Sequence, residues 1–272
     1  MKRVHDLERR LHSLHMLQEA VSAMKSLAAH HLREARAGLD AAHAYKQGVE
    51  RVGRQVGMAI PAGDGPGGLL IIGAELGLCG SYNSQVADVA MKHRTEHGLG
   101  PTFVMGRRVA TLVERRGIPD LRRYRAPTVS KGITDALLVL IQDVLGAYLK
   151  ERMAFLDVVA TPFAGVGRQK VEVTRLLPLS LHAEANAARV FYNEPNQVSQ
   201  AAARELLYST MYGVLLDALA AEHGARLAAT QAADRWLGER VEGLKRALAS
   251  VRREAGTQEV IEIATGARRR LA

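Results

Sequence analysis

Apolar residues recur at alternating three- and four-residue steps through the first part of the chain. From Val4 to Val49 this spacing reaches fourteen positions, and eleven of them are apolar. The three polar positions are Gln18, Lys25 and Lys46. Sustained spacing of this kind is typical of a helix whose apolar seam packs against another helix. About 50 helical residues at ~1.5 Å each extend roughly 75 Å, so the pattern predicts a rod that projects from its domain.

A second seam with the same spacing occupies the other end of the chain. It starts at Leu207 with mainly alanine positions and resumes, after one slip in phase, at Leu237 with leucine and valine. All 8 prolines lie between Pro61 and Pro195, so neither end segment contains the residue that breaks helix interiors. These patterns predict two long terminal helices, packed antiparallel if both leave the same globular body.

Short apolar runs alternate with helix-like segments in the middle of the chain, which favours a small Rossmann-like α/β domain. We expect strands at residues 69–72, 102–105, 155–160 and 171–177 and helices ending near residue 97 and spanning 107–116 and 133–152. The predicted fold class is therefore α/β plus a long antiparallel coiled coil, a two-helix rod. The predicted boundaries are 1–60 for the first helix, 68–192 for the central domain and 196–272 for the last helix.

Composition and charge narrow the possible functions. Aromatic residues make up 4% and apolar residues 47% of the chain, which suits long helices better than a compact enzyme. A formal net charge of +9 indicates an anionic partner, whether nucleic acid, a membrane surface or an acidic protein. The single cysteine, Cys79, excludes an internal disulfide framework and a multi-thiolate metal site. We expect a soluble chain, because it shows neither a signal peptide nor roughly 18 consecutive apolar residues.

The motifs that usually carry chemistry are weak in this sequence. Glycines at 73, 77 and 80 follow a predicted strand, but their spacing matches neither a dinucleotide fingerprint nor a P-loop, so a structural turn is favoured. His12 and His15 lie on adjacent helical turns without a third ligand of matching type nearby, and catalytic zinc needs three. We therefore predict no catalytic, cofactor-binding or metal-binding residues and no cofactor.

Two alternative functions remain open from the residues alone. Arg9, Arg10, Arg33, Arg36 and the run at 268–270 are able to bind phosphates, but no aromatic residues are interleaved with them. A basic coiled-coil nucleic-acid-binding protein is one alternative, and salt-sensitive DNA binding would support it. A stand-alone nucleotide-binding α/β enzyme is the other, and nucleotide turnover by the purified chain would support it.

Short motifs spread along the whole chain carry a family resemblance. They are Ala23-Met24-Lys25, Gly77-Leu78-Cys79-Gly80 with Asn83, Gly106-Arg107-Arg108, Leu176-Leu177-Pro178, Glu222-His223 with Arg226, Arg253, Thr257-Gln258-Glu259 and Gly266-Ala267. In this order they resemble the gamma subunit of F-type ATP synthases (ATPases). Departures such as Ala74-Glu75-Leu76 before the glycine turn and Glu254 after Arg253 mark a divergent member.

The resemblance implies a mechanical function without a local active site. A gamma subunit is the central stalk, or rotor shaft, of a rotary enzyme driven by protons or sodium ions, and its terminal helices lie inside a ring of alpha and beta subunits. The ATP chemistry takes place on the beta subunits. The α/β domain lies beside the epsilon subunit and on the membrane c-ring, at the cytoplasmic face of the inner (plasma) membrane. No nucleic-acid partner and no direct membrane span are implied.

The resemblance also assigns contact residues. Met24 and Lys25 correspond to positions where the shaft meets a loop of the beta subunit. Arg253, Gln258 and Glu259 are expected on the opposite helix near the same contact. Tyr192 and Glu194 are expected in a foot that contacts the ring or the epsilon subunit.

Overall fold

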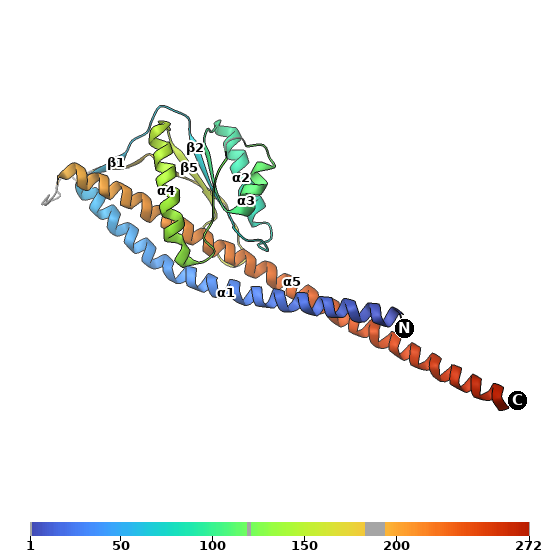
Figure 1. The fold of residues 1–272 in the computed structure, drawn as a ribbon. Helices are drawn as coiled ribbons and strands as arrows, with labels where there is room; N and C mark the ends of the chain where they lie inside the picture. Colours follow the sequence, from blue (N-terminus) through green and yellow to red (C-terminus); the bar gives the residue numbers. More distant parts are fainter. Residues whose placement is uncertain (1, 119–120, 183–193, 272) are drawn as a thin grey trace. The chain divides into compact units, whose positions relative to one another are not determined.

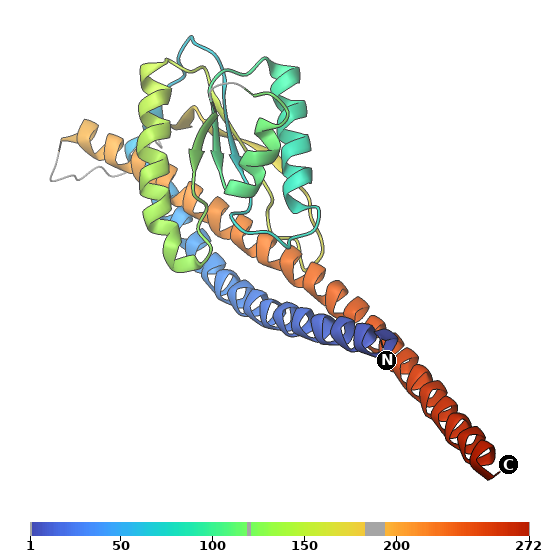
Figure 2. The ribbon, with the colours of Figure 1, turned by 45° about the vertical axis from the view of Figure 1, so that its right-hand side comes forward.

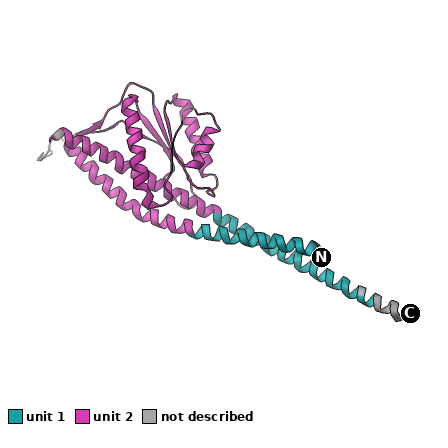
Figure 3. Ribbon diagram, in the orientation of Figure 1, with its two compact units in different colours: residues 1–26, 230–272 teal, residues 27–229 magenta. Residues whose placement is uncertain are grey.

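A computed structural model describes residues 2–118, 121–182 and 194–271 of the chain. The chain divides into two compact units, which Figure 3 distinguishes by colour. Unit 1 consists of residues 1–26 and 230–272, and unit 2 consists of residues 27–229. Each unit is described separately below.

Two long helices, α1 (Lys2–Val56) and α5 (Pro195–Leu271), contribute to both units. They confirm the prediction that both terminal segments of the chain are long helices. The predicted end of the first helix at residue 60 is wrong, because Gly57 adopts φ +69° and terminates α1. Residues Met58–Ile60 form strand β1 instead. Pro195 begins α5, at a position where its missing N–H group leaves no helical hydrogen bond unmade.

The parts of α1 and α5 in unit 1 run antiparallel. Lys25 forms an ion pair with Asp234, and Nη2 of Arg252 donates to Oε1 of Glu8 at 2.6 Å. Residue numbers therefore rise along one helix as they fall along the other. Apolar residues of the predicted second seam are buried in this unit at Leu237, Val241 and Leu248. Two helices with a buried seam and charged pairs between them match the predicted coiled coil.

The parts of the same helices in unit 2 are antiparallel as well. Two contacts show this: the rings of His31 and His223 pack with centroids 5.1 Å apart at a tilt of 38°, and the hydroxyl of Tyr45 donates to Glu205 at 2.8 Å. The predicted α1 seam is buried here at Ala28, Leu32, Ala35 and Ala42. Alanine at three of these four positions permits a close approach of the two helices.

The sheet of unit 2 has five strands in the order β4-β3-β2-β5-β6. Its strands are β2 (Gly68–Ile72), β3 (Thr102–Met105), β4 (Leu121–Tyr124), β5 (Leu156–Ala160) and β6 (Glu172–Leu177). The first four in spatial order are parallel, and β6 runs antiparallel to β5. All four predicted strands are confirmed. Separately, β1 pairs antiparallel with β7 (Leu179–Leu181).

Helices cover both faces of the sheet, as Figures 1 and 2 show. On one face lie α2 (Tyr82–His97) and α3 (Arg107–Glu114), and their core includes Leu69 and Ile71 of β2. On the other face lie α4 (Ile133–Lys150), which follows the 3-10 turn η1 (Ser130–Gly132), and the unit 2 parts of α1 and α5. Alternate residues of each strand therefore enter different cores, as the two-residue period of a strand requires.

The segment Ser130–Lys150 is long and apolar enough to cross a membrane by length and composition, with a mean hydropathy of 1.5. Packing explains part of its apolar character, whereas Leu138, Val139 and Leu149 are exposed. Leu137, Leu140, Val144 and Tyr148 of α4 are buried in the core shared with the sheet. A helix that covers a buried sheet needs this apolar face.

Candidate functional site

Ligands of doubly wound α/β folds bind at the carboxyl ends of the strands, where the strand order reverses. In this sheet the reversal lies between β2 and β5. The glycine turn at residues 73–80 follows β2 and occupies this edge. A nucleotide site in this fold would be expected at this position. The contacts around the turn therefore decide whether it is a nucleotide site or a structural turn.

The side chain of Asn83 closes the turn. Its Oδ1 accepts the backbone N–H of Ala74 at 2.9 Å, and its Nδ2 donates to Sγ of Cys79 at 3.2 Å. Gly80 adopts φ +57°, which favours glycine. These bonds from within the chain fix the conformation of the turn.

A carboxylate of the chain itself occupies the anion position beside the turn. Oε2 of Glu75 accepts the N–H of Arg107, the first residue of α3, at 3.1 Å. The same oxygen accepts the N–H of Ala126 at 3.2 Å. A helix N-terminus is where a parallel α/β fold usually binds a phosphate, and here Glu75 satisfies it.

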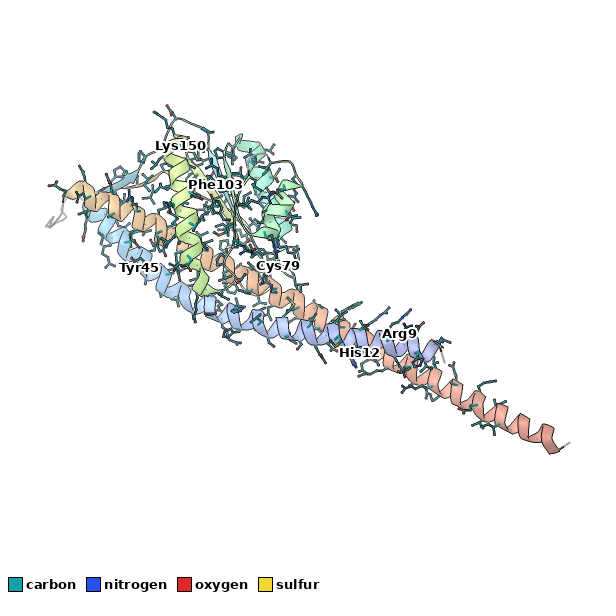
Figure 4. The ribbon with its side chains drawn as sticks, viewed as in Figure 1. Arg9, His12, Tyr45, Cys79, Phe103 and Lys150 are labelled. Atoms are coloured by element: carbon teal, nitrogen blue, oxygen red, sulfur yellow. The ribbon has the colours of Figure 1, made fainter. Side chains whose placement is uncertain are left out.

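Helix α5 holds the turn from its other side. Nε of Arg226 donates to the carbonyl oxygen of Gly77 at 3.1 Å and Nη2 to that of Leu76 at 3.4 Å. The same guanidinium forms an ion pair with Glu222, and the two residues are 4% and 3% exposed. Figure 4 shows Cys79, labelled in the turn, beside α5. We call Glu222, His223 and Arg226 the α5 clamp.

The bonds of His223 define its protonation state. Nη1 of Arg226 lies 3.1 Å from Nδ1 of His223, and a guanidinium only donates, so Nδ1 accepts. The proton is therefore on Nε2, which donates to the carbonyl oxygen of Thr128 at 3.2 Å. Burial, with the nearby charge of Arg226, lowers the pKa of His223 to about 4, which keeps the ring neutral near pH 7. Burial also raises the pKa of Glu222, and Arg226 opposes that rise.

Acid is expected to destabilise unit 2 through His223. The pKa is 6.5 in the unfolded chain and about 4 in the folded chain, so between these values the unfolded state binds more protons. The stabilisation is complete above pH 6.5 and falls by about 3 kcal/mol as the pH drops through 4. His223→Gln keeps one donor and one acceptor but does not titrate. Urea unfolding from pH 7 to pH 4 should show a shallower loss for this variant than for the parent, whereas His12→Gln should follow the parent. Equal pH dependence of all three proteins would contradict the assignment.

The clamp and Glu75 together favour the structural interpretation of the glycine turn. Arg226 attaches the turn to α5, and Glu75 bonds the first N–H of α3, so the polar groups of this edge are bonded within the chain. In the sequence, Glu222, His223 and Arg226 stand out only as part of a family motif. Their spacing on one helical turn was the available signal, but their partners at residues 76, 77 and 128 are remote in sequence.

The contact residues expected on the terminal helices lie in unit 1. Met24 is half-buried, and Lys25 is paired with Asp234 on α5. Arg253, Gln258 and Glu259 are exposed on α5.

The structure places these two groups at separate levels of unit 1. The Glu8–Arg252 bond puts Arg253 beside the first turns of α1, whereas Lys25 lies opposite Asp234. Asp234 and Arg253 are roughly 28 Å apart along a helix that rises ~1.5 Å per residue. The register in which α1 and α5 pair separates Lys25 from Arg253. Sequence motifs on the two helices do not reveal this register.

Of the two expected foot residues, the structure describes only Glu194. Tyr192 lies outside the described residues. Glu194 is exposed, and its carbonyl oxygen accepts the N–H groups of Gln197 at 3.0 Å and Val198 at 3.2 Å. Its backbone therefore caps the start of α5, and its side chain is available to a partner.

Unit 1 also has a surface groove that the sequence analysis missed. Its volume is about 460 Å³, and Trp236 in its wall is 58% exposed. The remaining lining residues are Asp6, Arg9, Arg10, Ser13, Leu14, Arg240 and Leu244. The only tryptophan of the chain, which falls outside the apolar seam of the last helix, was the available signal for this surface.

Comparison with known families and sequences gives a consistent result. A family model described as ATP synthase matches residues 3–268. The ATP synthase gamma chain of Moorella thermoacetica is 28% identical, over 98% of this chain and 99% of the relative. The ATP synthase gamma chain of an Exiguobacterium species is 31% identical, over 74% of this chain and 72% of the relative.

Solved structures show the same fold. A chain of the Euglena gracilis mitochondrial ATP synthase has a TM-score of 0.65 at 11% identity, covering 96% of this chain and 92% of the other. A chain from the central stalk and c-ring of the Tetrahymena thermophila mitochondrial ATP synthase has a TM-score of 0.61 at 16% identity, covering 79% and 99%. At these identities the likeness concerns the fold.

Proposed function

Because this chain belongs to the ATP synthase gamma-chain family, we propose that it is the central stalk, or rotor shaft, of a rotary F-type ATP synthase. It is a non-catalytic subunit that couples ion-driven rotation to ATP synthesis or hydrolysis in partner subunits. The observation that carries this proposal is the antiparallel pairing of α1 and α5 within each unit, with the sheet of unit 2 attached to α5 by the clamp.

The mechanism follows from unlike surfaces on the paired helices. In unit 1 the groove lined by Trp236, Arg240 and Leu244 combines apolar and basic side chains on one side of the helix pair, so the surface differs around the pair. Farther along α5, Val260 and Ile263 are exposed apolar residues. A catalytic subunit that meets different surfaces as the shaft turns has a different balance of open and closed states at each step. Rotation thereby changes the affinity of sites that the shaft itself does not contain. Exposed apolar side chains at the end of α5 are expected where a partner covers them.

The proposed partners follow the parts of the chain. Alpha and beta subunits surround α1 and α5, and the beta subunits carry the ATP chemistry. The domain of residues 68–192 lies beside the epsilon subunit and on the c-ring, with Tyr192 and Glu194 as foot contacts. The chain is then a peripheral component at the cytoplasmic face of the inner (plasma) membrane, without a membrane span of its own.

Purification of the native chain with its companions tests this proposal. We expect co-purification with alpha, beta and epsilon subunits, and ATP-driven rotation of a bead attached to unit 2 when the alpha and beta subunits are immobilised. Recovery without alpha and beta subunits would overturn the proposal. Salt-sensitive recovery with DNA would favour the nucleic-acid alternative, and ATP turnover by the chain alone would favour the enzyme alternative.

Contact with the beta subunits is proposed at two separate levels of unit 1, one at Met24 and Lys25 and one at Arg253, Gln258 and Glu259. Replacing Arg253 and Gln258 together with alanine is expected to reduce ATP-driven ion pumping per ATP hydrolysed by roughly fivefold or more, while assembly stays intact. Arg246→Ala, another exposed arginine of unit 1, is the matched control and should pump normally. Pumping ratios in membrane vesicles measure the effect, and an unchanged ratio in the double variant would remove this assignment.

A further inference from the structure

Three potential metal ligands meet on one turn of α1 in unit 2. They are His30, His31 and Glu34, and one ligand atom from each lies within 4.8 Å of those of the other two. Nδ1 of His31 lies 3.4 Å from Oε2 of Glu34, and the two histidine rings are 5.3 Å apart at 60°. The long nitrogen–oxygen distance is that of a weak hydrogen bond, so these groups are close but not tightly bonded.

The backbone beneath these side chains is held in place. The neighbouring residues Ala28, Leu32 and Ala35 are buried, and Leu32 and Ala35 belong to the main core of unit 2. His30 is exposed, and His31 and Glu34 are partly exposed, so an ion can reach all three from solvent. A rigid backbone with reachable side chains lowers the ordering cost of binding, because only side-chain rotamers need to change.

The donor set indicates the class of ion. Two imidazole nitrogens and one carboxylate oxygen form the ligand set of three-ligand zinc sites, which keep a further position for water. Imidazole also suits Cu²⁺, Ni²⁺ and Co²⁺, whereas Mg²⁺ and Ca²⁺ prefer oxygen ligands alone. Ligands about 2.0–2.2 Å from an ion lie closer together than 4.8 Å, so small side-chain rotations would complete the site.

We propose that His30, His31 and Glu34 bind one divalent transition-metal ion of the zinc class. His223 is excluded as a fourth ligand although its ring packs on His31, because Thr128 and Arg226 engage its two nitrogens. The remaining coordination position is therefore open to water or to a partner side chain. An ion that bridges positions i and i+4 fixes one helical turn, so binding also stabilises the folded chain.

Titration of the full-length chain with Zn²⁺ tests the site, with Co²⁺ as an optical probe of the ligands. We expect one ion per chain by calorimetry and a rise in the unfolding temperature at saturating Zn²⁺. His30→Ala and Glu34→Gln should each weaken binding by about tenfold or more and change the Co²⁺ absorption spectrum. His12→Ala/His15→Ala is the matched control, because it removes two histidines of α1 in unit 1 and should leave the affinity unchanged.

Three outcomes would overturn the proposal. These are the absence of stoichiometric binding, the same affinity in the parent, His30→Ala and Glu34→Gln, or an equal loss in the His12→Ala/His15→Ala control. The last result would mean adventitious binding by surface histidines only. The measurement uses the isolated chain, so its result is independent of the proposed stalk function.

Discussion

Replacing Arg226 with alanine is expected to lower the free energy of unfolding of unit 2 by about 3–5 kcal/mol. The substitution leaves the carboxylate of Glu222 buried without its partner, and Glu222 is only 3% exposed. It also removes the donors to the carbonyl oxygens of Leu76 and Gly77, so the glycine turn loses its bonds to α5. Urea unfolding followed by circular dichroism measures the loss.

Two further variants separate the clamp from a general loss of charge. Arg204→Ala removes an exposed arginine of α5 in the same unit and should change stability by less than about 0.5 kcal/mol. The double variant Arg226→Met/Glu222→Leu removes both buried charges and should be more stable than Arg226→Ala alone. A double variant as unstable as the single one would show that the unpaired carboxylate is not the cause.

Gly106→Ala is expected to destabilise unit 2 by about 3 kcal/mol. Gly106 ends β3 with φ +111°, a conformation that residues with a side chain rarely adopt. A methyl group at this position would lie 2.4 Å from the carbonyl oxygen of Gly73 and 3.0 Å from that of Ala74. Both are backbone atoms of the turn after β2. The added methyl group therefore fits only if the turn itself moves away from α3.

The control for this prediction is a glycine without these constraints. Gly146 lies inside α4, is exposed, and has open space where a methyl group would be added. Gly146→Ala should therefore stabilise the protein by up to about 1 kcal/mol through helix propensity. Opposite signs in thermal unfolding are the expected result, and a neutral Gly106→Ala variant would mean that the two loops are not held in close contact.

The terminal helices could be predicted from the sequence because their cause is local. A three–four apolar period and the absence of proline bear directly on helix formation, and neither depends on distant residues. The four strands with apolar, β-branched runs could be predicted from the sequence for the same reason. Strand β4 was missed because Arg122 and Arg123 are at the edge of the sheet, where the strand carries no apolar run. β1 and β7 have three residues each, which is too short for a period to show.

The polar contacts within each unit depend on pairs far apart in the chain. Only the register of the two antiparallel helices pairs Lys25 with Asp234 and separates both from Arg253. Only the packed sheet brings Gly77 and Thr128 to Arg226 and His223. By itself, the sequence determined the helices, most of the sheet and the family, because periodicity and motifs are local. The tertiary structure decided which charged and polar groups meet, because that requires the closure of long loops between them.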